Sequence, residues 1–217
     1  MALTATAGDV SAKIKPSRPS WADMTSHYPG KNVSTDFLYN GKIKGGFTNK
    51  EKVYENTCAI RMSYALLRSG FALHRNPGAV LGGDNRWYWI TVAELRAELT
   101  KRFKGFDAEL TFDRLPHSAG LSIEKLKPYT SARRLKAQQF LDTHLKGKQG
   151  IVVFRVAGWH DATGHFTLWD GKRNELAYAK GHDDPRTDEY YFWLTTTDAL
   201  GLGELVQVTQ IQFWELK

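Results

Sequence analysis

Residues 56–67 read Asn-Thr-Cys-Ala-Ile-Arg-Met-Ser-Tyr-Ala-Leu-Leu and contain Cys58, the only cysteine among 217 residues. This stretch predicts a buried helix. Asn56 is a favourable N-cap, because its side chain accepts a hydrogen bond from the first helical turn, and Gly70 is a natural C-terminal stop. Cys58 then lies in the first turn, where unpaired N–H groups and the helix dipole favour a thiolate. Cys58 is therefore either a nucleophile or a small apolar core residue.

The composition predicts one globular domain. A chain of 217 residues with 41% hydrophobic residues, seven Trp, nine Tyr and eleven Phe can bury a sizeable core. A single cysteine forms no internal disulfide and offers no cysteine cluster for zinc, so the fold does not require an oxidising compartment. We expect a protein made in the cytosol that needs no metal or other cofactor.

The sequence also limits the possible partners. No apolar run approaches the roughly 20 residues that span a bilayer, and residues 1–12 lack the pattern of a signal peptide. We therefore expect no membrane insertion and no export by the general secretory route. The net charge of +7 and pI of about 9.4 favour an anionic partner such as nucleic acid, an acidic membrane surface or a cell-wall polymer, or simply give a basic surface.

Helix signals dominate the first two thirds of the chain. Residues 1–15 are predicted to be a flexible N-terminal arm, and residues 16–217 a single domain. Ser20 provides an N-cap, and Thr91 with Glu94 forms a capping box. The predicted helices cover residues 21–28, 56–69, 92–103 and 131–145.

Strand signals dominate the last third. Runs rich in β-branched and aromatic residues alternate with turn signals at residues 150–156, 166–169, 176–178, 190–194 and 206–214. These runs predict an antiparallel meander. Helices followed by a sheet indicate the α+β class, with the helices packed on or beside one sheet.

His165 is the best partner for Cys58. It follows Gly164, which permits close backbone approach, and it opens a strand that leads to the hairpin turn at Asp170-Gly171. The imidazole can therefore face the end of a helix packed on the sheet. A cysteine at a helix start and a histidine on a core strand form the pair needed for thiolate attack.

Together, residues 56–66 and residues 164–171 resemble the two signature motifs of the fourth family of type VI secretion amidase effectors. These effectors are papain-like peptidases related to the NlpC-type cell-wall peptidases. The resemblance extends over nearly the whole chain from residue 16. It implies an α+β, papain-like (NlpC-type) fold in which helices pack against a central antiparallel sheet, and a single amidase domain over residues 16–217.

The resemblance also implies a function. Such an enzyme is a peptidoglycan amidase that cuts the stem peptide between γ-D-glutamate and meso-diaminopimelate. Cys58 would be the nucleophile, His165 the general base, and the Cys58 N–H part of the oxyanion hole. The effector would be made in the producer cytoplasm, delivered by the type VI apparatus to the target periplasm, and countered by a cognate immunity protein, with no nucleic-acid partner.

This chain departs from the family pattern at the third member of the catalytic triad. The family has a polar or acidic residue eleven or twelve positions after the histidine, whereas this chain has Leu176 and Ala177 there. If the hairpin loop contains three residues, Glu175 shares a face with His165 and can reach the imidazole. We therefore take Glu175 as the candidate third residue.

Other groups behind the histidine stay possible. Asp183 and Asp184 are alternatives if the chain curls back, and so is another residue or a backbone carbonyl. His182 stands beside two aspartates, but no second cluster of ligands supports a metal site. Two other functions also stay open: an acyltransferase that uses Cys58 and His165, and a basic toxin that binds nucleic acid.

Overall fold

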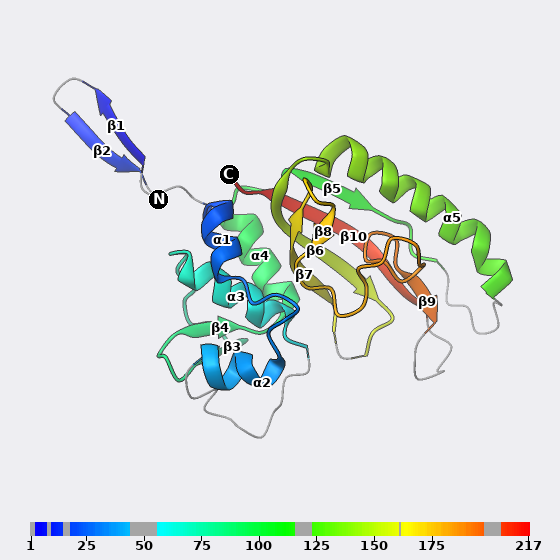
Figure 1. Ribbon diagram of the computed structural model, residues 1–217, viewed down its shortest axis with the longest axis horizontal. Coiled ribbons are helices and arrows are strands. Elements are labelled where there is room, and N and C mark those ends of the chain that lie inside the picture. Colours follow the sequence, from blue (N-terminus) through cyan, green and yellow to red (C-terminus); the bar gives the residue numbers. More distant parts are fainter. Residues whose placement is uncertain are drawn as a thin grey trace.

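A central antiparallel sheet separates two groups of helices in the computed structural model (Figure 1). The structure describes residues 3–7, 10–14, 18–43, 56–115, 123–160, 162–197 and 205–217. The predicted α+β arrangement, with helices packed against a central antiparallel sheet, is confirmed.

The sheet has six strands. They are β5 (Ala108–Thr111), β6 (Gln149–Ala157), β7 (Gly164–Asp170), β8 (Glu175–Leu176), β9 (Thr195–Thr197) and β10 (Leu205–Glu215). Their order is β5-β10-β6-β7-β8, and β9 also pairs with β10. The predicted meander therefore describes only β6, β7 and β8. The long β10 lies in the middle of the sheet, and most of its side chains are buried, as expected for a central strand.

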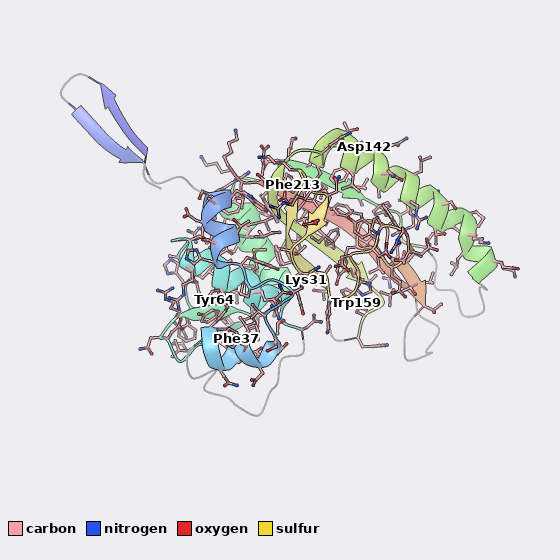
Figure 2. The ribbon with its side chains drawn as sticks, in the orientation of Figure 1. Lys31, Phe37, Tyr64, Asp142, Trp159 and Phe213 are labelled. Carbon is pink, nitrogen blue, oxygen red and sulfur yellow. The ribbon has the colours of Figure 1, made fainter. Side chains whose placement is uncertain are left out.

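Both faces of the sheet are covered by side chains that alternate along each strand. On β6, Val152 and Phe154 belong to one core cluster, whereas Ile151 and Val153 belong to the other. Phe213 of β10, labelled in Figure 2, is fully buried in the first cluster. This period of two places every second residue against a different helix layer.

Helices occupy both faces of the sheet (Figure 1). On one face lie α1 (Trp21–His27), α3 (Cys58–Arg68) and α4 (Val92–Arg102), and on the other lies α5 (Ile123–Phe140). Smaller elements complete the described chain: α2 (Thr35–Phe37), β3 (Ala79–Leu81), β4 (Trp87–Trp89), and the π-helical turns η1 (Leu38–Lys42) and η2 (Leu141–Leu145). The helix α3 is thus enclosed between the sheet and the N-terminal elements.

Several helix ends follow the predicted signals. The Ser20 side chain accepts from the Asp23 N–H at 3.0 Å. The Thr91 hydroxyl accepts from the Glu94 N–H at 3.4 Å and donates to the Glu94 carboxylate at 2.8 Å. Gly70 adopts a positive φ of 82° just beyond α3. The predicted Asn56 cap is wrong, because the N-cap residue of α3 is Thr57, whose side chain makes no capping hydrogen bond.

The secondary structure differs from the sequence prediction in three places. Residues 190–194 form a buried turn instead of a strand, because their aromatic side chains fill the core without an extended backbone. The helix α5 begins at Ile123 instead of Ser131 and continues through Pro128, which removes one main-chain hydrogen bond near its start. The strand β5 lies in a segment for which the sequence predicted neither a helix nor a strand.

The N-terminal segment contains a hairpin. The strands β1 (Leu3–Ala7) and β2 (Val10–Ile14) pair antiparallel and project from the body of the molecule (Figure 1). The flexibility of this arm and the domain boundary at residue 16 stay predictions.

Candidate active site

The candidate site lies on the free edge of β7. The short β8 pairs only with the end of this strand, where Trp169 faces Leu176 and Asp170 faces Glu175. Nearer the start of β7, side chains from other elements take the place of a neighbouring strand. The Tyr28 hydroxyl, for example, donates to the Phe166 carbonyl at 3.4 Å.

The Cys58 thiol contacts the same edge of β7 at Gly164 and Phe166, the residues before and after His165. Its Sγ atom lies 4.0 Å from the Gly164 carbonyl oxygen, and the Phe166 backbone N–H points to the sulfur. Gly164 is needed there, since a Cβ atom on it would lie 2.2 Å from the Phe154 carbonyl oxygen. The structure therefore brings Cys58 against the residues that flank the predicted base.

The position of Cys58 follows from the sequence of α3. Cys58 is the first residue of the helix and is 2% exposed. Its neighbours Ala59 and Met62 pack in the core between α3 and the sheet. One turn further on, the Ser63 hydroxyl donates to the Trp89 carbonyl at 2.9 Å and so fixes the helix to β4. The thiol is consequently held at a rigid helix start.

The His165 ring is fixed by one hydrogen bond and two aromatic neighbours. Its Nε2 atom lies 2.7 Å from the Tyr178 carbonyl oxygen. A carbonyl only accepts, so Nε2 carries the proton and Nδ1 keeps its lone pair. The ring stacks against Tyr191, with centroids 4.4 Å apart, and lies 5.6 Å from the Tyr178 ring. The neutral imidazole is therefore in the tautomer that can accept a proton at Nδ1.

Burial decides the protonation of both groups. It raises the pKa of the Cys58 thiol, although the N–H groups of Phe166, Ala59 and Cys58 lower that pKa in part. It also lowers the pKa of His165 to about 3, against a smaller opposite effect of the Tyr178 carbonyl. Desolvation of the thiol therefore outweighs the effect of the helix start, which alone would favour a thiolate. The resting pair is a neutral thiol and a neutral imidazole.

Glu175 is not brought to His165. Its direct neighbour across the hairpin is Asp170, five residues from His165 along β7. Five residues correspond to about 16 Å of extended strand, and residues an odd number apart point to opposite faces. The loop contains residues 171–174, with Asn174 at a φ of 56°, so it is longer than the three-residue loop on which the Glu175 assignment depends. The expected place of Glu175 behind the imidazole is therefore wrong.

Asp184, one of the two alternative acidic residues, has another partner. The Asp184 carboxylate accepts from the Arg186 guanidinium at 2.8 Å. His182 Nδ1 donates to the Glu189 carbonyl at 2.8 Å. Within the described residues no group of three or more His, Cys, Asp or Glu side chains is arranged to hold a metal ion. The group behind His165 is therefore the Tyr178 carbonyl, one of the possibilities left open by the sequence.

A cavity of about 290 Å³ opens beside the thiol. Its walls come from the start of α3, the beginning of α4 and the connection between β6 and β7, which contains Trp159 (Figure 2). The lining residues are Asn56, Cys58, Ile90, Thr91, Val92, Trp159, His160, Ala162, Thr163 and Gly164. Cys58 is therefore one of the residues that a molecule in this cavity would contact.

Comparison with known protein families identifies the chain. Residues 54–214 match the family described as type VI secretion system (T6SS), amidase effector protein 4, or Tae4. The chain belongs to this family. Tae4 proteins are peptidoglycan amidase effectors with a cysteine-based site, so this chain is a cysteine-based hydrolase of that class. The match does not favour the acyltransferase or nucleic-acid alternatives.

Solved Tae4 structures share the fold. The Tae4–Tai4 effector–immunity complex from Enterobacter cloacae matches with 26% identity, a TM-score of 0.57, and coverage of 92% of this chain and 99% of that chain. The Tae4–Tai4 complex from Salmonella Typhimurium matches with 25% identity, a TM-score of 0.58 and the same coverage. The predicted papain-like (NlpC-type) fold is therefore confirmed. No match was found among curated proteins.

Three residues of this Tae4-family site were missed by the sequence analysis. Tyr178 acts through its main chain, which no side-chain pattern reveals. Tyr191 belongs to the aromatic run that we took for a strand. Arg61 offered a usable signal, because it is a charged residue three positions after Cys58 on a helix face that is otherwise apolar.

Among the described helices, none is long and apolar enough to cross a bilayer.

Proposed function

We propose that Cys58 and His165 are the nucleophile and general base of this amidase, and that it hydrolyses the γ-D-glutamyl–meso-diaminopimelate bond of the stem peptide. One observation carries the assignment. The thiol lies between the main-chain groups that flank His165, whose imidazole keeps a lone pair on Nδ1. Cys58 and Gly164, the residue before His165, also line the cavity that could hold a substrate.

The first half of the reaction forms a thioester. His165 Nδ1 accepts the Cys58 proton as the sulfur attacks the carbonyl carbon of the γ-glutamyl amide. The carbonyl oxygen then becomes an oxyanion. The Cys58 N–H belongs to the first turn of α3, whose N–H groups have no partner within a helix, and it is the candidate donor to that oxyanion.

The second half releases both products. The imidazolium of His165 protonates the diaminopimelate amine as the C–N bond breaks, leaving the γ-glutamyl group on the sulfur. Water then loses a proton to His165 and attacks the thioester. Cleavage of the C–S bond frees the γ-carboxylate, and the thiolate recovers its proton from His165. The cycle needs no metal ion or organic cofactor.

The cavity suits a short peptide with both apolar and polar parts. Trp159, Ile90 and Val92 supply apolar walls, and Asn56 and Thr163 supply polar groups. The basic chain, with its net charge of +7, is attracted to the carboxylates of peptidoglycan stems. These features support a stem peptide as the substrate.

The partners follow from the same assignment. The matched effectors from E. cloacae and S. Typhimurium are seen with Tai4 immunity proteins. We therefore propose that a cognate immunity protein inhibits this effector, that the type VI apparatus delivers it, and that it acts in the periplasm of the target cell.

Digestion of purified peptidoglycan, followed by mass spectrometry of the fragments, tests the proposal. The wild-type enzyme should release fragments with a free amino group on diaminopimelate and a free γ-carboxylate on glutamate. Cys58→Ala and His165→Ala should release neither. Cleavage at another bond would contradict the substrate, and wild-type cleavage by either variant would contradict the catalytic pair.

A further inference from the structure

The Tyr178 carbonyl, which orients His165, belongs to the segment that follows the last residue of β8. The strand β8 ends at Leu176, and Tyr178 lies beyond it in no strand. A peptide carbonyl is neutral, so it attracts an imidazole N–H less strongly than a carboxylate would. It can fix the ring only if its own segment is fixed.

Backbone contacts hold one side of this segment. The Ala177 N–H donates to the Leu168 carbonyl at 3.0 Å, and the Ala177 carbonyl accepts from the Lys31 N–H at 3.3 Å. The Tyr178 N–H donates to the Thr167 hydroxyl at 2.9 Å. These bonds place the segment beside β7 but leave the Tyr178 side chain to be held by other residues.

Arg61 holds the Tyr178 ring. Its guanidinium lies 4.1 Å from the centroid of the ring and is held in turn by several oxygen atoms. Arg61 is 1% exposed. The guanidinium donates to the Thr57 hydroxyl at 2.9 Å and to the carbonyls of Pro29, Gly30 and Val33 at 2.8, 3.0 and 2.7 Å.

These partners make Arg61 an unusual core residue. All of its described hydrogen-bond acceptors are neutral oxygens, and a buried cation without a carboxylate partner is costly. Arg61 stands one turn after Cys58 on α3. It therefore connects the helix that carries the thiol with the residue that orients the imidazole.

We propose that Arg61 is a positioning residue that clamps Tyr178, so that the Tyr178 carbonyl holds His165 in place of the acidic side chain of the family. This inference rests on the proposed roles of Cys58 and His165. Without the clamp, the Tyr178 carbonyl moves away from Nε2, the imidazole rotates, and neither the Nε2–H tautomer nor the direction of the Nδ1 lone pair stays fixed.

The electrostatics of the site agree with this role. Burial lowers the pKa of His165, and the positive charge of Arg61 lowers that pKa further. Burial, with a smaller contribution from the Arg61 charge, thus keeps the imidazole uncharged in the resting enzyme, although the Tyr178 carbonyl acts on the pKa in the opposite direction. The Nδ1 lone pair is therefore unprotonated in the resting enzyme.

Arg133 supplies a matched control on the opposite face of the sheet. It is also buried, at 6% exposure, and it donates to main-chain carbonyls of Asp113 and Val208. Its guanidinium lies 4.4 Å from the centroid of the Phe112 ring. Arg133→Met therefore removes the same kind of packing as Arg61→Met without touching His165.

The test combines kinetics with the tautomer of His165. Full-length protein labelled with ¹⁵N-histidine is measured by long-range ¹H–¹⁵N NMR, and a His165→Gln spectrum assigns the signal. Wild-type His165 should show the single Nε2–H form. Arg61→Met should show mixed tautomers and a kcat about 10- to 100-fold lower on a soluble muropeptide, with a nearly unchanged KM.

The companion variants separate positioning from stability. Arg61→Lys keeps the charge but not the planar fork, so its kcat should lie between those of wild type and Arg61→Met. Arg133→Met should lower the melting temperature yet keep the wild-type tautomer and kcat per folded molecule. If Arg61→Met does not fold, Tyr178→Leu removes the ring that Arg61 holds and should give the same tautomer mixture and kcat loss.

A folded Arg61→Met or Tyr178→Leu protein with wild-type kcat and a single Nε2–H tautomer would overturn the proposal. The NMR signal needs no turnover, so it decides this point even if Cys58→Ala stays active. Failure of the catalytic assignment and failure of the positioning role are therefore distinguishable.

Discussion

The helices α3 and α5 pack on opposite faces of the same sheet and use the same means of attachment. Each buries one arginine that donates to main-chain carbonyls and lies over an aromatic ring, Arg61 on α3 and Arg133 on α5. Helix packing of this kind is therefore not specific to the catalytic side.

The two helices differ in the part of the sheet that they meet. Arg133 reaches the Val208 carbonyl at the β-bulge of β10, a strand with neighbours on both sides. The start of α3 instead meets the free edge of β7, where Cys58 and Tyr28 approach unpaired main-chain groups. The candidate pair therefore lies where a helix start meets the part of β7 that β8 does not cover.

The largest expected effect compares small buried residues on the two helices. Cys58→Ser should lower amidase activity by about 10³-fold or more, because a serine hydroxyl in this site is a far weaker nucleophile than a cysteine thiol. Ala137→Ser, on the buried face of α5, should cost about 1 kcal/mol of stability and leave the activity per folded molecule intact. Kinetics on a soluble muropeptide and thermal unfolding measure both, and equal activity of the two variants would contradict the assignment.

A smaller effect is expected at the cavity wall. Trp159 lines the cavity and packs edge-on against Tyr191, with centroids 6.1 Å apart. Trp159→Ala should lower kcat/KM by about tenfold, since substrate contact and support of Tyr191 are both lost. Tyr129→Ala, which removes an exposed aromatic residue of α5, should leave kcat/KM unchanged in the same assay. The cavity assignment is wrong if both variants behave alike.

The stability should depend on pH through His165. Its pKa is lowered to about 3 in the folded protein, whereas a free histidine titrates near 6.5. The unfolded chain therefore binds a proton first as the pH falls, and stability decreases between about pH 6.5 and pH 3. Chemical denaturation at several pH values should show this loss. His165→Gln should reduce the slope of the unfolding free energy against pH. An unchanged slope would mean that His165 is not buried in its neutral form.

The smallest effects are expected at the acidic residues that the structure places elsewhere. Glu175→Gln and Asp184→Asn should change kcat/KM by less than about twofold, because neither carboxylate orients His165. The muropeptide assay measures both. A large loss in Glu175→Gln would restore the acidic triad and contradict the role of the Tyr178 carbonyl.

The sequence predicted those features that depend on local patterns. The helix α3, the N-cap at Thr91 and the long strands β6 and β10 follow from the sequence pattern, although the predicted cap of α3 at Asn56 does not. The glycine-histidine step at the start of a core strand also predicted that His165 would lie near the start of α3, and Cys58 contacts its neighbour Gly164, while the catalytic roles of the two residues stay a proposal.

The rest depends on long-range packing. The hairpin loop of residues 171–174 sets the register that moves Glu175 away from His165, and one residue more or less would reverse the face. The Tyr178 carbonyl is a main-chain group that every residue carries, so no residue type marks it. The buried turn at residues 190–194 has the composition of a strand because both environments select aromatic side chains.

Trapping the acyl-enzyme tests the central claim most directly. Acid-quenched reactions of the full-length enzyme with a γ-D-glutamyl-diaminopimelate muropeptide are analysed by mass spectrometry of the intact protein and its peptides. The account predicts a γ-glutamyl adduct on the Cys58 peptide of the wild-type enzyme, and no adduct in Cys58→Ala or His165→Ala. An adduct on another residue, or wild-type hydrolysis by Cys58→Ala, would contradict the account.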